Sequence, residues 1–401
     1  MLLTALFLDL VGLLFIACLV LAIWAVYFHF SKSEVPSGVC QPLKLRFLHI
    51  DYILYKMGFF SRYTLVRLGL DGFSPFCDPT LSTRMTFFDG VCVRIYRPKE
   101  MPAGLNRGIM FFHGGCGLVG SIDSHDRLCR YISKQSHSVV VSVEYHLAPE
   151  YSHPTLFTEC QNATVHFMRN AETYGVDPAR IILGGDSIGG TVVAHLSQEL
   201  SKRTELTRIR AQVLLYPFLQ ALDFHLPSHQ QNRCFPIISQ EQCIIFAMQY
   251  FNKVKSLVDL IVNGSFVSEN TKARYSKWVN SDRIPREFKN RNPKEAMSVC
   301  SESNPHKLMK QVLGTIFSPL LSDDDVMKDV PEAFILTCEY DIFRDDGILY
   351  KQRLEENGVP VSFCNLEDGF HACLVLINHW LISFPSAKNG LDHVVNYIRG
   401  L

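Results

Sequence analysis

The stretch IILGGDSIGGT, from Ile181 to Thr191, places one serine between two pairs of glycines. Gly185, Ser187 and Gly189 form the pattern G-x-S-x-G, which follows an apolar run and precedes a run with helical spacing. A sharp turn from a strand into a helix leaves no room for side chains two residues before and after its central residue. The pattern therefore predicts that Ser187 is a nucleophile exposed at such a turn. The alternative is a glycine turn without function.

Strand and helix patterns alternate on both sides of this turn. Apolar runs predict strands over residues 91–98, 108–115, 138–145, 179–185, 209–217, 332–340 and 360–368. Helical spacing predicts helices over residues 125–135, 154–175, 189–200, 347–358 and 390–400. This alternation predicts an α/β fold for residues 85–401, with a mostly parallel central sheet and helices on both faces. Residues 220–318 do not follow this alternation of strand and helix patterns. We interpret them as a helical cap inserted above the sheet.

A serine hydroxyl needs a general base to become a nucleophile, and the base needs an orienting acid. Asp341 and His371 each come directly after a predicted strand, and they follow Ser187 in the chain order serine, acid, histidine. Because the carboxyl ends of parallel strands share one edge of a sheet, we expect these three side chains to meet there. Asp345 and Asp346 compete for the role of the acid, but they fall at the start of a predicted helix and are interpreted as its caps.

The negative oxygen of a tetrahedral intermediate needs backbone donors close to the nucleophile. The sequence FFHGGCG, residues 111–117, follows a strand pattern and offers closely spaced N–H groups. The residue after the serine offers another. We therefore expect an oxyanion hole next to the motif residue His113, and the alternative is again a glycine turn without function. The candidate residues of this hole are Gly114, Gly115, Cys116 and Ile188.

Composition excludes several classes of function. The chain has 401 residues, 47% of them hydrophobic, and a formal net charge of +0 at pH 7. It therefore has enough apolar material for a large core and no electrostatic footprint for nucleic acid. None of its 13 cysteines lies in C-x-x-C spacing, so no metal site is expected. Nothing in the sequence predicts a protein partner.

The N-terminus predicts contact with a membrane. Residues 10–28, LVGLLFIACLVLAIWAVYF, carry no charge and are long enough as a helix to cross a hydrocarbon core of about 30 Å. Because no basic residue precedes Lys32, we interpret residues 1–30 as a retained transmembrane signal anchor rather than a cleaved signal or a buried helix. Residues 31–84 include basic and apolar positions that predict amphipathic helices. These helices pack on the domain as ordinary surface helices or form part of a lid.

Two possible N-glycosylation sites favour a lumenal catalytic domain. Asn162 and Asn263 each begin an N-x-S/T triplet. Charge does not decide the orientation of the anchor, because Lys32 and Glu34 nearly cancel. Use of either triplet depends on the side of the membrane on which the domain lies.

The motifs together resemble one family. The chain resembles the arylacetamide deacetylase-like proteins of the hormone-sensitive-lipase group of α/β-hydrolases, also called GDXG lipolytic enzymes. The motifs that carry the resemblance are HGG (113–115), YHLAPE (145–150), GDSIGG (185–190), SPLLSDDD (318–325), CEYDIFRDDG (338–347) and DGFH (368–371). The resemblance implies an α/β-hydrolase fold and a single-pass type II protein of the endoplasmic reticulum with a lumenal catalytic domain. It implies hydrolysis of carboxylic esters or aryl amides without a cofactor, with Ser187, Asp341 and His371 as the catalytic residues and Gly114 and Gly115 in the oxyanion motif.

The sequence departs from the family pattern at two positions. Cys116 stands where the family has the third glycine of HGGG, and His146 stands where it has the arginine of YRLAPE. The cysteine keeps a backbone N–H, but its Cβ adds bulk where glycine offers conformational freedom. A disulfide between Cys116 and Cys338 is one alternative, and two free buried thiols are the other.

Two hypotheses of function follow from the sequence. The first is a membrane-anchored serine esterase or deacetylase that acts on lipophilic esters or amides through an acyl-enzyme. The second is a catalytically weak or inactive protein of the same fold that binds a small apolar ligand, for which Cys116 is the main support. Turnover that depends on Ser187 separates the two.

Overall fold

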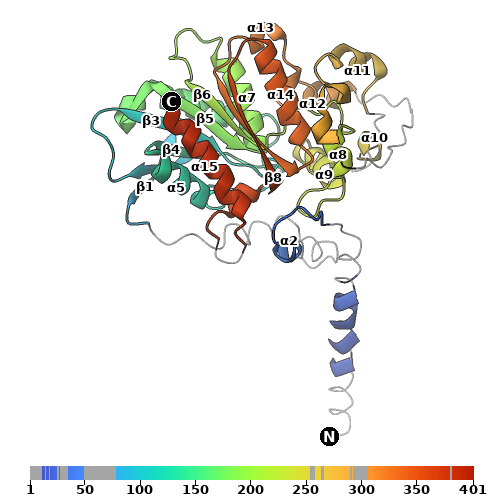
Figure 1. The fold of residues 1–401 in the computed structure, drawn as a ribbon. Helices are drawn as coiled ribbons and strands as arrows, with labels where there is room; N and C mark the ends of the chain where they lie inside the picture. Colours follow the sequence, from blue (N-terminus) through green and yellow to red (C-terminus); the bar gives the residue numbers. More distant parts are fainter. Residues whose placement is uncertain are drawn as a thin grey trace.

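The computed structural model describes residues 11–13, 15–17, 19–24, 27, 35–48, 78–252, 258–262, 266–289, 291, 306–379 and 382–401. Among these residues the core of the molecule is an eight-stranded sheet with helices on both faces (Figure 1). The strands are β1 (Leu81–Phe88), β2 (Val91–Pro98), β3 (Asn106–Phe112), β4 (Val139–Glu144), β5 (Val176–Asp186), β6 (Ala211–Leu215), β7 (Ala333–Tyr340) and β8 (Val361–Phe370).

The sheet has the order β1-β2-β4-β3-β5-β6-β7-β8. The pairs β1–β2 and β2–β4 are antiparallel, and every pair from β4 to β8 is parallel. The predicted α/β fold with a mostly parallel sheet is therefore confirmed. Because β5, β6, β7 and β8 are parallel neighbours, their carboxyl ends share one edge.

Two hydrophobic cores lie on the two faces of the sheet. Side chains alternate along a strand, so Met110 and Phe112 of β3 enter one core while Ile109 and Phe111 enter the other. The first core is covered by α6 (Thr155–Arg169), α7 (Ile188–Leu200) and α14 (Arg344–Glu356), and the second by α5 (Asp126–Ser136) and α15 (Pro385–Gly400). This double cover explains why the central strands read as continuous apolar runs.

The apolar patterns of the sequence do not predict strand β1. Its residues 81–84 fall in the segment expected to form amphipathic helices, but they pair with β2 in a hairpin. The signal was Asp89-Gly90, whose φ values of 48° and 86° fit the tight turn that an Asp-Gly pair favours. Within the same segment, α2 (Pro42–Leu48) is a helix. Residues 49–77 lie outside the described residues.

The described residues between β6 and β7 form short helices joined by loops and contain no strand. The helices are α8 (Pro227–Gln231), α9 (Gln240–Tyr250), α10 (Val258–Val262), α11 (Glu269–Tyr275), η3 (Ser281–Arg283), η4 (Arg286–Lys289), α12 (His306–Val312), η5 (Pro319–Leu321) and α13 (Asp324–Met327). Helices α8 to α12 gather on one side of the sheet (Figure 1). The remaining short helices are η1 (Ala171–Tyr174) and η6 (Cys373–Leu376).

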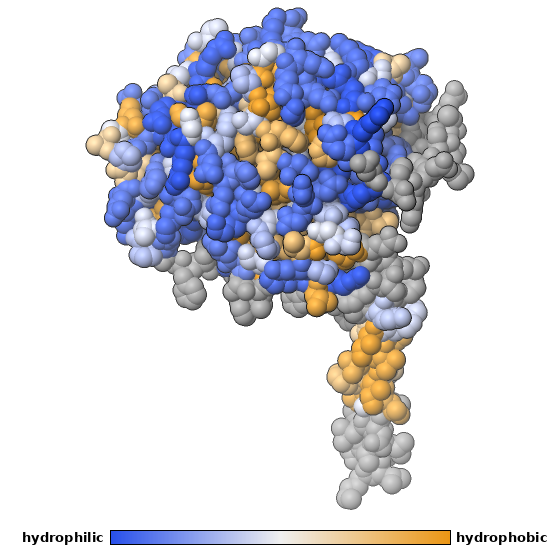
Figure 2. Space-filling model, viewed as in Figure 1, coloured by the Kyte–Doolittle hydropathy of each residue, from blue (hydrophilic) through white to orange (hydrophobic). Residues whose placement is uncertain are grey.

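The described N-terminal residues are helical and carry exposed apolar side chains. The exposed fractions of the large side chains run from 48% at Val11 to 70% at Tyr27, and this part of the chain forms an apolar column in Figure 2. A search of the described residues finds no helix with the length and apolar character that a membrane crossing requires.

Candidate active site

Ser187 lies at the turn between β5 and α7 in a backbone conformation that side chains rarely adopt. Its φ is 54° and its ψ is −119°. A Cβ on Gly185 would lie 2.5 Å from the carbonyl oxygen of Gly189, and a Cβ on Gly189 would lie 2.0 Å from that of Phe112. Both glycines are therefore required by the close approach of backbone to backbone. The turn lifts the serine above the sheet edge and stores local strain.

Three side chains that are far apart in the sequence meet at this turn. Ser187, Asp341 and His371 each stand one residue after the end of their strands, which are β5, β7 and β8. His371 Nε2 lies 3.0 Å from Ser187 Oγ, and His371 Nδ1 lies 2.8 Å from Asp341 Oδ2. All three residues are buried, with exposed fractions of 5% or less. The arrangement supplies a hydroxyl, a base in contact with it and a carboxylate that orients the base.

Further contacts hold the acid and the imidazole in place. Asp341 Oδ1 accepts the N–H of Phe343 at 2.9 Å, which leaves Oδ2 to face His371. The rings of Tyr216 and Phe343 lie edge-on to the imidazole, each with a centroid distance of 5.2 Å. The imidazole is thus confined by aromatic rings as well as by the carboxylate.

The loop from His113 to Gly117 runs beside the serine. Gly115, Cys116 and Gly117 have φ values of 118°, 59° and 70°, so the cysteine adopts the left-handed conformation that favours glycine. A Cβ on Gly115 would lie 2.0 Å from the carbonyl oxygen of Val119, which explains the glycine there. No described residue accepts a hydrogen bond from the N–H of Gly115 in this loop.

Gly114 does not offer a free donor, which corrects its expected place in the oxyanion hole. Its N–H donates to Asp186 Oδ1 at 2.8 Å, and a Cβ on it would lie 2.6 Å from Asp186 Oδ2. The same Oδ1 lies 3.1 Å from His125 Nε2. Burial alone would raise the pKa of Asp186, but His125 and the Gly114 N–H lower it. Asp186, the residue directly before the serine, therefore ties the loop to the turn that carries Ser187. Sequence reasoning missed this role.

His113 is packed inside the molecule rather than aimed at the serine. Its ring stacks on Tyr145 with a centroid distance of 4.1 Å, and its Nδ1 lies 2.8 Å from the carbonyl oxygen of Gly114. Burial lowers its pKa to about 3, so the ring is neutral at pH 7. The observed contacts of His113 are therefore packing and hydrogen-bond contacts within the fold.

Asp345 and Asp346 do not cap helix α14, contrary to the sequence interpretation. Phe343 is the residue before the helix, and no side chain caps it. Asp345 Oδ2 instead accepts the N–H of Ser228 at 2.7 Å. Asp346 Oδ2 accepts the N–H of Leu219 at 2.9 Å, and burial raises the pKa of Asp346 to about 7. Both carboxyls bind residues of the segment between β6 and β7, which local sequence could not reveal.

The two departures from the family pattern have local partners. His146 Nδ1 lies 2.6 Å from Glu159 Oε1, and the His146 N–H donates to the same carboxylate. Cys116 and Cys338 are both free thiols, and no disulfide joins them. The Sγ atom of Cys338 instead lies 4.0 Å from that of Cys373. Among the described residues no cluster of histidine, cysteine and acidic side chains could hold a metal ion.

Comparison with known proteins agrees with this geometry. Residues 109–273 and 282–375 match the family described as alpha/beta hydrolase fold. The chain belongs to this family. Human arylacetamide deacetylase-like 4 is similar to this alpha/beta hydrolase, with 38% identity over 387 residues that cover 94% of this chain and 95% of the human protein. Bovine neutral cholesterol ester hydrolase 1 is 31% identical over 389 residues, which cover 92% of this chain and 95% of the bovine protein.

A solved esterase from Pseudomonas putida shares the fold of this alpha/beta hydrolase. It superposes with a TM-score of 0.66 at 21% identity, covering 92% of this chain and 98% of the esterase. The similarity to the human relative over nearly the whole chain places this chain among the arylacetamide deacetylase-like proteins. This alpha/beta hydrolase is an enzyme of the carboxylic ester hydrolase class.

Proposed function

We propose that this protein is a membrane-anchored serine hydrolase that cleaves carboxylic esters or aryl amides of lipophilic substrates. The observation that carries the proposal is the contact of His371 with Ser187 at 3.0 Å and with Asp341 at 2.8 Å. These distances are those of a serine activated by an imidazole that a carboxylate orients. The proposed catalytic domain is residues 85–401, with the cap at 220–318.

In the proposed mechanism Ser187 Oγ attacks the carbonyl carbon of the substrate while His371 Nε2 takes its proton. Asp341 holds the Nδ1–H tautomer and stabilises the charged imidazolium. The N–H groups of Gly115, Cys116 and Ile188 are the proposed donors to the oxyanion, and each such donor lowers the barrier by about 3 kcal/mol. His371 then protonates the leaving alcohol or amine. Water, activated by the same imidazole, cleaves the acyl-enzyme and restores the hydroxyl.

Aromatic rings around the site support a lipophilic substrate. Phe343 contacts His371, and Phe218 lies next to Phe343 with a ring centroid distance of 5.3 Å. Phe218 also contacts Phe317, and Tyr250 stacks on Phe317 at 5.8 Å. Apolar walls around a few placed polar groups are typical of pockets for apolar ligands. One relative is named as a hydrolase of cholesterol esters, which are lipophilic.

We propose that residues 1–30 anchor the enzyme as a single-pass type II protein of the endoplasmic reticulum, with the catalytic domain in the lumen. The uncharged run at 10–28 and its exposed apolar side chains support the anchor. Asn162 is exposed on α6, as a glycan acceptor must be, while Asn263 lies outside the described residues. Alkaline carbonate should release from microsomes a variant in which a cleavable signal peptide replaces residues 1–30, and should leave the full chain bound. Loss of the glycosidase-sensitive mass shift in Asn162→Gln would place the domain in the lumen.

The decisive test of the chemistry is Ser187→Ala in the full chain. We expect the variant to lose both labelling by a fluorophosphonate probe and hydrolysis of a short-chain aryl ester, because the substitution removes the nucleophile but no packing. Steady turnover by the wild type also excludes a protein that only binds an apolar ligand. Equal labelling or hydrolysis of wild type and variant would contradict the proposed mechanism.

A further inference from the structure

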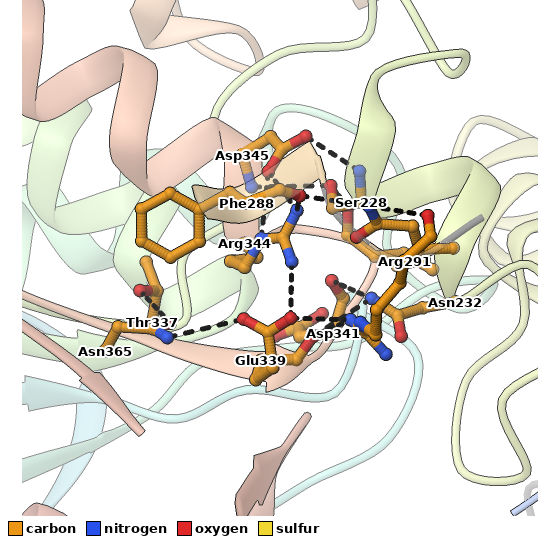
Figure 3. A network of polar contacts seen from close by, with 12 residues as sticks. Ser228, Asn232, Phe288, Arg291, Thr337, Glu339, Asp341, Arg344, Asp345 and Asn365 are labelled. Atoms are coloured by element: carbon orange, nitrogen blue, oxygen red, sulfur yellow. Dashed lines mark hydrogen bonds and ion pairs between the residues drawn. The ribbon is translucent and has the colours of Figure 1, made fainter. Parts of the chain in front are cut away.

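The segment from Glu339 to Asp345, here called the acid turn, contains Asp341 and is held by residues of the proposed cap. The turn leaves β7 and enters α14, so its own strand and helix fix only its two ends. Polar side chains from the cap contact its middle (Figure 3). This inference rests on the proposed function of Asp341 and adds to it the residues that position the acid.

Asn232, directly after α8, makes the central contact. Its Nδ2 donates to the carbonyl oxygen of Asp341 at 3.0 Å and to that of Glu339 at 3.2 Å. Both partners are acceptors only, so the amide has a single favourable orientation. Asn232 is 2% exposed, which excludes water as an easy substitute for these bonds. One cap side chain therefore holds the main chain at the acid itself and two residues before it.

A second set of cap contacts surrounds the first. Arg291 donates to the carbonyl oxygen of Glu339 at 2.6 Å and pairs with its carboxylate at 3.0 Å. Arg344 on the turn is fully buried, and it donates to Glu339 Oε1 at 2.9 Å and to the carbonyl oxygen of Phe288 at 2.8 Å. Figure 3 shows Arg344 and Arg291 converging on Glu339. Breaking such a buried network is costly because its charges would be left unpaired.

Ser228, in α8, contacts the C-terminal end of the acid turn. Its hydroxyl donates to the carbonyl oxygen of Ile342 at 2.7 Å, and its N–H donates to Asp345 Oδ2 at 2.7 Å. Asp341 thus has its carboxylate on His371 and its carbonyl oxygen on Asn232, while the neighbouring peptide is held by Ser228. The direction of the carboxylate depends on where these cap residues place the peptide.

We infer that Asn232 is a positioning residue for Asp341, and that the cap orients the catalytic acid as well as covering the site. Asn232 does not touch the reacting atoms, so it acts through the main chain of the acid turn. A displacement of about 1 Å in a positioned group lowers kcat by up to about a hundredfold. Removing the Asn232 amide should therefore lower kcat without weakening substrate binding.

The test is a double-mutant cycle on the full chain with an activated aryl ester. The variants are Asn232→Ala, Asp341→Asn and their combination, with Gln230→Ala as the matched control. Gln230 lies in α8, two residues before Asn232. Its side-chain amide donates to the carbonyl oxygen of His225, which is inside the cap and not in the acid turn. We expect Asn232→Ala to lower kcat by about tenfold or more with KM within about twofold of the wild type. Gln230→Ala should keep the wild-type kcat.

The combination decides between positioning and general support of the fold. If Asn232 acts through Asp341, adding Asn232→Ala to Asp341→Asn should produce no further loss of kcat. A full additional loss, or a wild-type kcat in Asn232→Ala, would overturn the inference while the proposed function stands. A wild-type kcat in Asp341→Asn would instead overturn the proposed catalytic role of Asp341, and the inference with it. If Asn232→Ala does not fold, Arg291→Ala is tested instead, because Arg291 is half-exposed. Its loss of kcat should likewise not add to that of Asp341→Asn.

Discussion

At the scale of single residues, the site depends on backbone conformations that few side chains tolerate. Ser187 and Cys116 both adopt positive φ values, and the glycines beside them allow main chains to approach closely. The serine conformation is held by its N–H, which donates to the carbonyl oxygen of Leu215 at 3.0 Å. Strain of this kind persists only where surrounding structure enforces it. The turn is therefore sensitive to a single added methyl group.

We expect Gly189→Ala to disrupt the turn. The added Cβ would lie 2.0 Å from the carbonyl oxygen of Phe112, a main-chain atom of β3 that cannot move alone. The expected loss of unfolding free energy is about 1–3 kcal/mol, together with most of the hydrolytic activity. Urea denaturation and fluorophosphonate labelling measure the two effects. Gly400→Ala is the control, because nothing lies within 4 Å of its Cβ position. Wild-type labelling of Gly189→Ala would refute the steric argument.

At the scale of elements, the helix after the acid turn is joined to the segment between β6 and β7 rather than capped locally. Asp345 and Asp346 of α14 bind main-chain N–H groups of Ser228, Leu219 and Gln220. A carboxylate at a helix N-terminus is a common local stabiliser, and sequence alone suggests that role. In the structure the same carboxylates bind residues far away in the sequence, because folding brings the segment between β6 and β7 against the start of α14.

Asp346 should make stability depend on pH. Burial raises its pKa from 3.8 to about 7, so its contribution is complete below about pH 4 and is lost as the pH rises to about 7. The loss amounts to roughly 1.4 kcal/mol per pH unit. Asp346→Asn removes the titration. We expect the unfolding free energy of the wild type, minus that of the variant, to fall between pH 5 and pH 7. A constant difference in urea denaturation would show that the carboxyl does not titrate there.

At the scale of the whole molecule, the sheet edge gathers the site and the two cores bury several histidines. His113, His195 and His229 are each less than 9% exposed. Burial lowers their pKa values to about 3, about 4 and about 3. Each is therefore neutral in the folded protein at pH values where the unfolded chain binds a proton. These three histidines lower stability as the pH falls, whereas Asp346 lowers it as the pH rises. The two effects are therefore opposite, and there are three histidines against one carboxyl.

The folded domain should accordingly lose stability in mild acid. The contribution of each histidine is complete above about pH 6.5, the ordinary pKa, and is lost as the pH falls below it. His229 packs edge-on to Phe224 and Phe343, and neither ring nitrogen has a partner among the described residues. His229→Leu should therefore flatten the acid side of the stability profile by roughly 1.4 kcal/mol per pH unit. The exposed His393→Asn is the control. Parallel profiles for wild type and His229→Leu between pH 4.5 and 6.5 would contradict this account.

Local patterns in the sequence determined the strands β2 to β8, the helices on the two faces and the sharp turn at Ser187. They did so because apolar periodicity and glycine spacing report on neighbours along the chain. Strand β1, the hairpin partner of β2, was not predicted, although the pair Asp89-Gly90 indicates the tight turn between the two strands. Only the tertiary structure decided that the Gly114 N–H belongs to Asp186, that Asp346 binds Leu219, and that Asn232 holds the acid turn. Such contacts join residues about 70 to 130 positions apart, and no short-range periodicity encodes them because they form only when whole elements pack.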